Sequence, residues 1–86
     1  MICRVITTPQ ANRQFEKLDR QFQDRVRRAI EALADNPRPM SCVKLSGPEG
    51  WYRIRVGDYR IIYDIQDRHL VVIVIRIGHR REVYRF

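Results

Sequence analysis

The stretch Trp51–Tyr63, WYRIRVGDYRIIY, decides the fold. Polar and apolar residues alternate on either side of Gly57-Asp58, and this period of two is typical of β-strands with one solvated and one buried face. A Gly-Asp pair between two such runs indicates a two-residue turn, because glycine adopts a positive φ without steric cost. The stretch therefore predicts a β-hairpin.

The predicted hairpin gathers arginines on one face. If Gly57 and Asp58 form the turn, Arg55 lies opposite Arg60. Arg53 falls on the same face, because side chains alternate along a strand. Like charges directly opposite each other destabilise a sheet, so their accumulation indicates that an anion binds there. Phosphate is the natural candidate, because a guanidinium donates two parallel hydrogen bonds to it.

The composition also indicates a basic, anion-binding domain. The chain has 86 residues and a formal net charge of +7, which suits a single domain, 1–86, with one modest core. Only Lys17 and Lys44 among its 17 basic residues are lysines. This preference for arginine favours planar, bidentate recognition of phosphate or carboxylate.

Several kinds of site and location are not expected. Cys3 and Cys42 are too few and too far apart for a zinc site, so we expect no metal and no cofactor, and two reduced thiols. A disulfide between Cys3 and Cys42 is the alternative that the sequence leaves undecided. The N-terminal MICRVITT has no apolar stretch long enough for a signal peptide, and no segment approaches the roughly 20 apolar residues of a membrane span. We therefore expect a cytoplasmic protein with no membrane contact.

The rest of the chain predicts a helical hairpin and further strands. Thr8-Pro9 supplies an N-cap hydroxyl and a proline at the first helical position. Apolar residues then recur every three or four positions, with a break near Leu18–Gln21, and the second helix ends before Asn36-Pro37. The other predicted elements are strands at Ile2–Thr7, Cys42–Leu45 and Leu70–Ile77, with a turn at Asp67-Arg68.

The order of these elements predicts the fold class. A β-α-α-β-β-β(-β) chain is expected to form an α+β two-layer fold, with the helical hairpin packed on one face of a twisted, mainly antiparallel sheet. Leu70–Ile77 is almost uninterrupted Leu, Val and Ile, which is typical of a central strand covered on both faces. Arg53, Arg55 and Arg60 are then left on the face away from the helices.

The C-terminal segment is expected to complete the site. Leu70–Ile77 should run antiparallel to the second hairpin strand, which brings Gly78 back to the hairpin turn. Arg80 and Tyr84 can then converge on the hairpin arginines. Strict alternation places His79, and not Arg80, on the arginine side, but a bulge at Gly78 would reverse this. The sequence leaves that register open.

An arginine cluster with one histidine and one tyrosine suits RNA cleavage by the 2′-hydroxyl. Arginines stabilise the negative charge of the phosphorane, but they are poor proton carriers because their pKa exceeds about 12. Tyr84 or His79 must then transfer the protons. Simpler roles also fit: Tyr84 as a cap of the core, His79 as a surface histidine, and Arg76 as a structural partner of an acidic side chain.

Several segments together closely resemble the RelE/ParE toxin superfamily, on its RelE side. They are VKLSG, WYRIRVGDYRIIYDI, VVIVIRIGHRREVYR and the helical start TPQANRQFEKL. The resemblance implies a RelE-like fold and a toxin of a type II toxin–antitoxin pair that cleaves mRNA in the ribosomal A site, leaving a 2′,3′-cyclic phosphate and a 5′-hydroxyl. It also implies three partners, namely a cognate acidic antitoxin, the ribosome and mRNA. The cleavage chemistry itself needs no metal, because Glu82 and Asp64 do not form a two-metal ligand set.

The resemblance further implies roles for individual residues. The residues implied to be catalytic are Arg55, Arg60, His79, Arg80 and Tyr84. The residues implied to bind RNA are Lys44, Arg53 and Arg81. Tyr84 would be the general base, with His79 as alternate or partner, because the best-known relative has lysine at the His79 position. The spacing from Gly78 to Tyr84 is shorter than in that relative, so Arg81 could take the place of Arg80.

Two other functions stay open at this point. A ParE-type toxin would inhibit gyrase and have no nuclease chemistry; the Arg80/Tyr84 ending and the arginine-rich hairpin argue against it. A non-catalytic RNA-binding domain would need the arginines, but Tyr84 would be dispensable.

Overall fold

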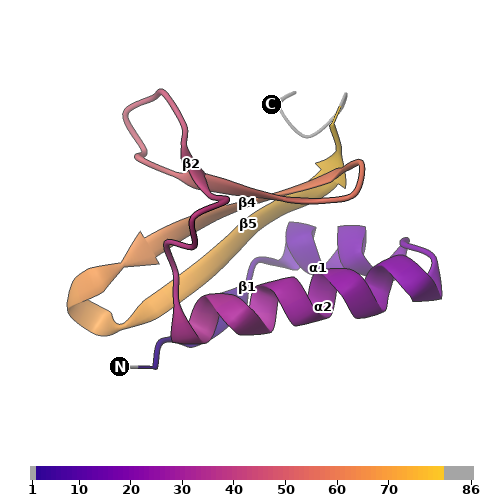
Figure 1. The fold of residues 1–86 in the computed structure, drawn as a ribbon, viewed down its shortest axis with the longest axis horizontal. Coiled ribbons are helices and arrows are strands. Elements are labelled where there is room, and N and C mark those ends of the chain that lie inside the picture. The colour runs from indigo at the N-terminus through magenta and orange to yellow at the C-terminus, as the bar shows by residue number, and fades with distance from the viewer. Residues whose placement is uncertain (1, 81–86) are drawn as a thin grey trace.

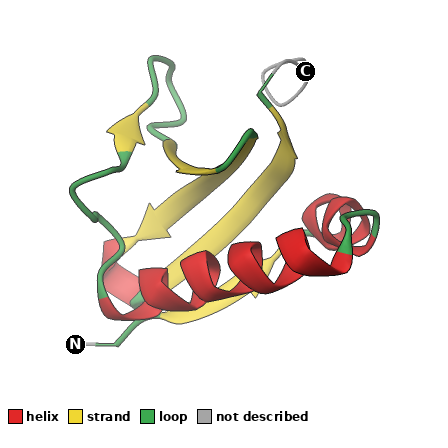
Figure 2. Ribbon diagram, turned by 45° about the vertical axis from the view of Figure 1, so that its right-hand side comes forward, coloured by secondary structure: helices red, strands yellow, loops and turns green. Residues whose placement is uncertain are grey.

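Two helices lie on one face of a five-stranded sheet (Figure 1 and Figure 2). The structure is a computed structural model, and it describes residues 2–80. The helices are α1 (Pro9–Glu16) and α2 (Arg20–Asp35). The strands are β1 (Arg4–Thr7), β2 (Val43–Lys44), β3 (Tyr52–Val56), β4 (Tyr59–Gln66) and β5 (Val71–His79), and the 3-10 helix η1 (Asp67–His69) joins β4 to β5. The predicted α+β two-layer fold is confirmed. We call the face away from the helices the outer face.

The sheet is mixed, and β5 lies between β1 and β4. The strand order is β1-β5-β4-β3-β2. β1 pairs with β5 in parallel, and the other neighbours are antiparallel. The single parallel pair follows from the chain path, because the helical hairpin separates β1 from the meander and provides the long crossover that a parallel pair requires. The prediction of a mainly antiparallel sheet is confirmed.

The helical hairpin begins and breaks as its sequence predicts. Thr8 is the N-cap of α1, and its hydroxyl oxygen accepts a hydrogen bond from the backbone N–H of Ala11 at 3.1 Å. Pro9 follows at the first helical position, where its missing N–H is not needed. α2 ends at Asp35 because the next residues are Asn36 and Pro37, and a residue before proline disfavours helical geometry.

The core lies between the inner face of the sheet and the two helices. The helices contribute the buried residues Ala11, Val26 and Leu33. The sheet contributes the buried residues Ile54, Val56, Ile61, Tyr63, Val72, Val74 and Ile77. Cys3 and Cys42 are both free thiols. Within residues 2–80, neither helix is long and apolar enough to cross a bilayer.

The predicted hairpin turn is confirmed. Gly57 has φ +59°, and the two-residue turn sets the predicted register, in which Arg55 lies opposite Arg60. A positive φ at the first central position is the signature of a hairpin turn that needs glycine there. The turn also packs on α2, because a Cβ at Gly57 would lie only 3.3 Å from Cε1 of Phe22.

Gly57→Ala is expected to lower the free energy of unfolding more than Gly50→Ala does. Both glycines have positive φ, +59° and +69°, so each alanine brings a backbone cost of about 1–2 kcal/mol. Only position 57 adds a tight contact, because the nearest atom to a Cβ at Gly50 is Cε of Lys44 at 4.0 Å. Urea denaturation of the two variants measures the difference. Equal losses would show that the contact with Phe22 adds nothing.

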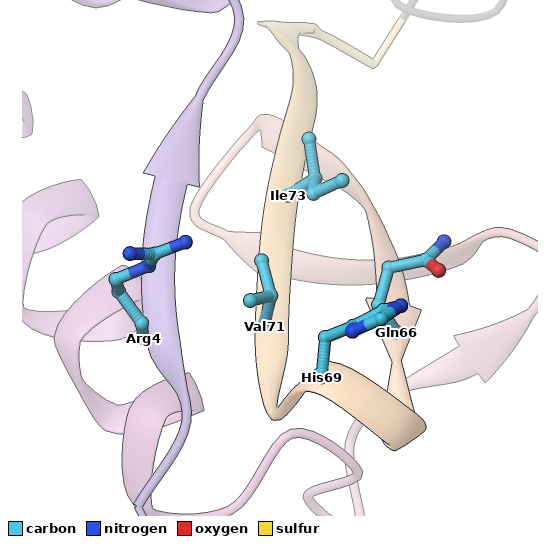
Figure 3. Close-up of a pocket in the computed structure, with 5 residues that line it drawn as sticks. All are labelled: Arg4, Gln66, His69, Val71 and Ile73. Atoms are coloured by element: carbon cyan, nitrogen blue, oxygen red, sulfur yellow. The ribbon is translucent and has the colours of Figure 1, made fainter.

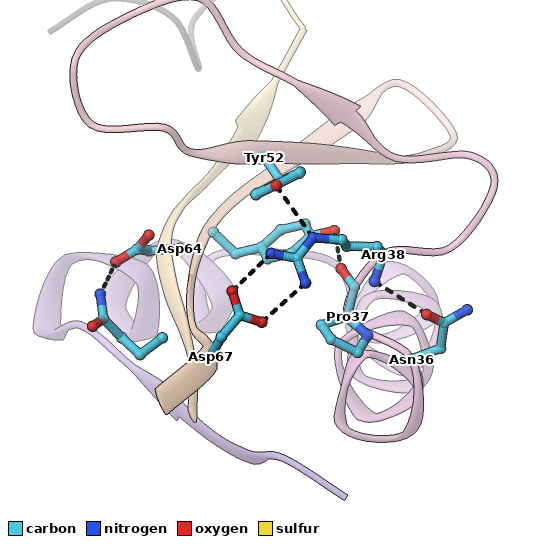
Figure 4. A network of polar contacts seen from close by, with 8 residues as sticks. Asn36, Pro37, Arg38, Tyr52, Asp64 and Asp67 are labelled. Carbon is cyan, nitrogen blue, oxygen red and sulfur yellow. Dashed lines mark hydrogen bonds and ion pairs between the residues drawn. The ribbon is translucent and has the colours of Figure 1, made fainter. Parts of the chain in front are cut away.

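A polar network fastens the end of the hairpin away from its turn (Figure 4). Arg38 donates to both carboxylate oxygens of Asp67, at 3.0 and 2.9 Å, and to the Tyr52 hydroxyl at 3.2 Å. These bonds raise the pKa of Arg38 and lower the pKa of Asp67. The fully buried Tyr63 donates its hydroxyl to the Pro37 carbonyl at 2.7 Å, and burial raises the pKa of Tyr63. The connector after α2 is thereby fixed to three parts of the sheet region, β3, β4 and η1.

Candidate functional site

Arg60 is the buried centre of the outer face. It pairs with Arg55 on β3 and with Gly78 on β5. Only 6% of Arg60 is exposed. Its Nη1 donates a long hydrogen bond of 3.4 Å to the Tyr59 carbonyl, and its Nε is buried without an acceptor among residues 2–80. Burying a charged donor in this way is costly unless an anion pairs with it, so this position is suited to bind one.

A second row of side chains lies beside the first on the outer face. Ile62 of β4 pairs with Arg53 on β3 and with Arg76 on β5. Ile62 is fully buried, and both arginines are half-buried. We call the four outer-face arginines, Arg53, Arg55, Arg60 and Arg76, the arginine face. The predicted grouping of the first three is confirmed by the strand register. The sequence does not predict that Arg76 belongs to the arginine face. Only its cross-strand pairing with Ile62 identifies it as a member.

A β-bulge brings Arg76 to this face. The register of β4 against β5 shifts between Ile62 and Tyr63, so that Ile75 is an extra residue in β5. Side-chain alternation therefore reverses at Ile75. The glycine in the sequence indicates Gly78 as the candidate position for a bulge. In the structure the bulge lies earlier in the strand, at Ile75, where the unbroken apolar run gives no signal for it.

Side chains from the helical layer hold the bulge in place. The Thr8 hydroxyl donates to the Ile75 carbonyl at 3.0 Å, and the Thr8 N–H donates to the Val74 carbonyl at 3.0 Å. The Ile77 N–H donates to Oε1 of Gln14 at 2.7 Å. β1 ends before this part of β5, so these two side chains satisfy backbone groups that a neighbouring strand would otherwise pair.

Gln14→Leu is expected to lower the free energy of unfolding by about 1–3 kcal/mol, because the part-buried Ile77 N–H loses its acceptor. Gln14→Glu keeps an oxygen at the same place and is the matched control. Chemical denaturation of both variants gives the comparison. If the leucine variant were as stable as the glutamate variant, the bulge would not depend on this bond.

His79 lies on the helical side of the sheet. It pairs with Tyr59 in the register, and the two rings meet edge to face with centroids 6.0 Å apart. With Leu18 and Lys17 it lines a pocket of about 540 Å³ beside α1. The expectation from strict alternation, that His79 shares the arginine side, is therefore wrong, because the bulge at Ile75 reverses the order of the side chains.

Arg80 lies next to the hairpin turn. Its backbone N–H donates to the Asp58 carbonyl at 2.9 Å, which confirms that the end of β5 returns to this turn. The Arg80 side chain is exposed. Alternation from Gly78, the partner of Arg60, favours the arginine face for Arg80. Arg81 and Tyr84 lie outside the described residues.

Lys44 lies apart from the arginine face. It pairs with Tyr52, and its Nζ lies 6.0 Å from the centroid of the Tyr52 ring. Its neighbour Val43 is the residue that pairs with Arg53. The structure therefore does not bring Lys44 together with the other predicted RNA-binding residue on the sheet, Arg53.

The outer face also carries a shallow open pocket of about 670 Å³ at the other end of the sheet (Figure 3). Its lining residues are Arg4, Gln66, His69, Val71 and Ile73, and none of the predicted site residues is among them. Because Ile73 is only half-buried here, the expectation that β5 is covered on both faces is wrong for this part of the strand. Within residues 2–80, no group of three or more His, Cys, Asp or Glu side chains is placed to hold a metal ion.

Comparison with known proteins identifies the family. A family model described as the ParE toxin of the type II toxin–antitoxin system parDE matches residues 5–84. The chain belongs to this ParE toxin family. It is 31% identical over 72 residues to a RelE-like toxin protein of Escherichia coli, covering 81% of this chain and 75% of that protein. It is 30% identical over 78 residues to the mRNA interferase toxin RelE of Escherichia coli strain K12, covering 86% of this chain and 81% of the relative.

A solved structure shares the fold of this ParE-family toxin. It is the archaeal RelE–RelB complex from Pyrococcus horikoshii, with a TM-score of 0.84 and 26% identity, covering 96% of this chain and 100% of that chain. The predicted membership of the RelE/ParE toxin superfamily is therefore confirmed, and the chain is a RelE-like toxin of a type II toxin–antitoxin system.

Proposed function

We propose that this toxin is a ribosome-dependent endoribonuclease that acts in the cytoplasm and cuts mRNA in the ribosomal A site. The observation that carries the proposal is Arg60, a guanidinium 6% exposed with a buried Nε that has no acceptor within residues 2–80. Arg55 lies directly opposite it and is exposed. An RNA phosphate would pair with the buried charge and offset the repulsion between the two arginines.

The reaction is an attack by the ribose on the adjacent phosphate. The 2′-oxygen loses its proton to a general base and bonds to phosphorus, which gains negative charge in the phosphorane. The bond to the 5′-oxygen then breaks, and that oxygen takes a proton from the protonated base or from water. The products are a 2′,3′-cyclic phosphate and a 5′-hydroxyl. Arginine donors aimed at the phosphorane supply electrostatic stabilisation, so the proposed reaction is metal-independent.

The outer-face residues take the phosphate-binding roles. Arg55 and Arg60 hold the scissile phosphate, Arg80 joins them from the end of β5, and Arg53 binds the RNA backbone. Arginine does not release its proton, so another group must be the base. We assign that role to Tyr84, since His79 contacts Tyr59 on the helical side of the sheet. Lys44 and Arg81 are proposed as outlying RNA contacts.

Two relatives support the activity and the partners. The name of the RelE relative from Escherichia coli strain K12 describes it as an mRNA interferase toxin, and the Pyrococcus horikoshii RelE was solved as a complex with RelB. A net charge of +7 suits an acidic antitoxin, because complementary charge speeds association and suppresses wrong partners. We propose such an antitoxin as the cognate partner.

The test is to map mRNA 5′ ends in a purified translation system with and without ribosomes. Cuts at codon-phased positions that require ribosomes and leave a 5′-hydroxyl are expected. Cutting of naked mRNA at the same sites would contradict ribosome dependence. Protein that binds programmed ribosomes without cutting would instead identify a non-catalytic RNA-binding domain.

A second candidate function is inhibition of gyrase, because the matching family model is described by the ParE toxin of parDE. In that case the arginine face would contact the enzyme or its DNA and no RNA would be cut. Purified gyrase with supercoiled plasmid separates the two candidates. Double-strand breaks in the presence of the toxin would support this candidate. Unchanged gyrase activity would exclude it and favour the nuclease function.

A further inference from the structure

Arg76 occupies a defined place on the arginine face. It lies across β4 from Arg53, with the fully buried Ile62 between them. Strands are about 4.8 Å apart and residues about 3.4 Å apart along a strand. The Arg53–Arg76 row therefore lies roughly 7 Å from the row that contains Arg60, close to the separation of neighbouring phosphates in an extended RNA strand.

The side chain is partly enclosed in this position. Arg76 is half-buried, and its Nε atom, like that of Arg60, is enclosed by protein atoms. Beside it, its cross-strand partner Ile62 gives the arginine stem an apolar surface to lie against, an arrangement that orders a long charged side chain. An arginine ordered in this way loses less entropy when its fork binds a phosphate.

The bulge at Ile75 is what directs Arg76 outward. Without the extra residue, alternation would send position 76 to the helical side, where the core lies. Thr8 and Gln14 hold the backbone on both sides of the bulge, with bonds of 3.0 Å to the Ile75 carbonyl and 2.7 Å from the Ile77 N–H. The fold thus uses side chains of the helical hairpin to place an arginine on the opposite face.

We propose that Arg76 binds an RNA backbone phosphate next to the one that is cut. This inference rests on the proposed nuclease function and adds a substrate-binding residue to it. Arg76 then contributes to binding of the RNA in the ground state and the transition state alike, whereas Arg55 and Arg60 act on the charge that develops during the reaction. A uniform binding contribution changes the half-saturating concentration and leaves the maximal rate almost unaltered.

Arg76→Met tests this role, because methionine keeps an apolar stem beside Ile62 and removes the charge. In single-turnover cleavage on mRNA-programmed ribosomes, the half-saturating toxin concentration should rise by about 10- to 100-fold. The maximal rate should stay within about threefold of the original. Arg4→Met is the matched control, since Arg4 is an exposed arginine on β1 whose partner Val71 lies on the same face.

Neutral linkages in the mRNA identify the contact directly. A methylphosphonate at one linkage beside the cut should weaken binding of the original protein and of Arg4→Met. Arg76→Met should be indifferent to that same linkage, because the charged group that would sense it is gone. Arg76→Lys, which keeps the charge without the fork, should regain part of the affinity and the sensitivity to the linkage.

The outcomes separate this inference from the proposed function. If the original protein and Arg4→Met cut mRNA and Arg76→Met has the same half-saturating concentration, the inference is wrong while the nuclease function stands. It is also wrong if Arg4→Met and Arg76→Met lose affinity equally, since that reflects net charge, or if Arg76→Met loses only thermal stability, which indicates a structural ion pair. If the original protein cuts nothing on ribosomes, the proposed function fails and the inference falls with it.

Discussion

Arg60→Met is expected to lower the rate of mRNA cleavage on ribosomes by about 10²- to 10³-fold without lowering the free energy of unfolding. The two effects have different origins. Arg60 is the buried arginine that would face the phosphorane, so its loss removes a donor aimed at developing charge. For the fold, replacing a buried charge by an apolar side chain of similar length is often neutral or stabilising. The variant also relieves the like-charge pair with Arg55.

Single-turnover cleavage and urea denaturation of the same protein preparation measure both effects. Arg13→Met, an exposed position on α1, removes the same charge away from the arginine face and is the control for net charge. It should keep its cleavage rate. Full activity of Arg60→Met would remove Arg60 from the mechanism, and a stability loss of more than about 3 kcal/mol would show that Arg60 is paired within the fold.

The hairpin could be predicted because its signals are local. Gly57 specifies the turn, the turn specifies that Arg55 faces Arg60, and alternation places Arg53 on the same face. The cap at Thr8 and the helix end before Pro37 are equally local. Each of these features depends on residues a few positions apart, so each can be recognised from a short stretch of the sequence alone.

The part of the site on β5 could not be predicted, because it depends on contacts between residues that are far apart in the sequence. The bulge at Ile75 is fixed by Thr8 and Gln14, which lie 67 and 63 residues from the groups that they bind. The part of β5 from Val71 to Ile75 is apolar on both faces, so it has no polar–apolar alternation from which a slip could be noticed. This one shift moved His79 to the helical side and Arg76 to the arginine face.

The same shift sharpens the question of proton transfer. The arginine face supplies positive charge in abundance, but arginine remains protonated throughout the reaction. Among the residues predicted to be catalytic, His79 and Tyr84 are the two that are not arginines. The register removes His79 from the outer face. Tyr84, outside the described residues, is the remaining proton carrier of that set.

Tyr84→Phe is therefore expected to lower the maximal single-turnover rate of mRNA cleavage by about 10²- to 10⁴-fold. Phenylalanine keeps the ring and removes only the phenolic oxygen, which as the phenolate accepts the proton of the 2′-oxygen. Binding to programmed ribosomes should be unchanged, because the charges that hold the RNA are untouched. Rapid-quench kinetics at saturating toxin give the rate, and a ribosome-binding titration gives the affinity.

His79→Gln is the matched comparison, because it removes the other proton carrier while keeping a polar side chain beside Tyr59. Its maximal rate should stay within about tenfold of the original, since its ring meets Tyr59 on the helical side of the sheet. The opposite ranking, with His79→Gln inactive and Tyr84→Phe active, would assign proton transfer to His79. The end of β5 would then have to change its register on the ribosome so that His79 reaches the outer face. Equal and severe losses would mean that both groups transfer protons, one as the general base and the other as the general acid.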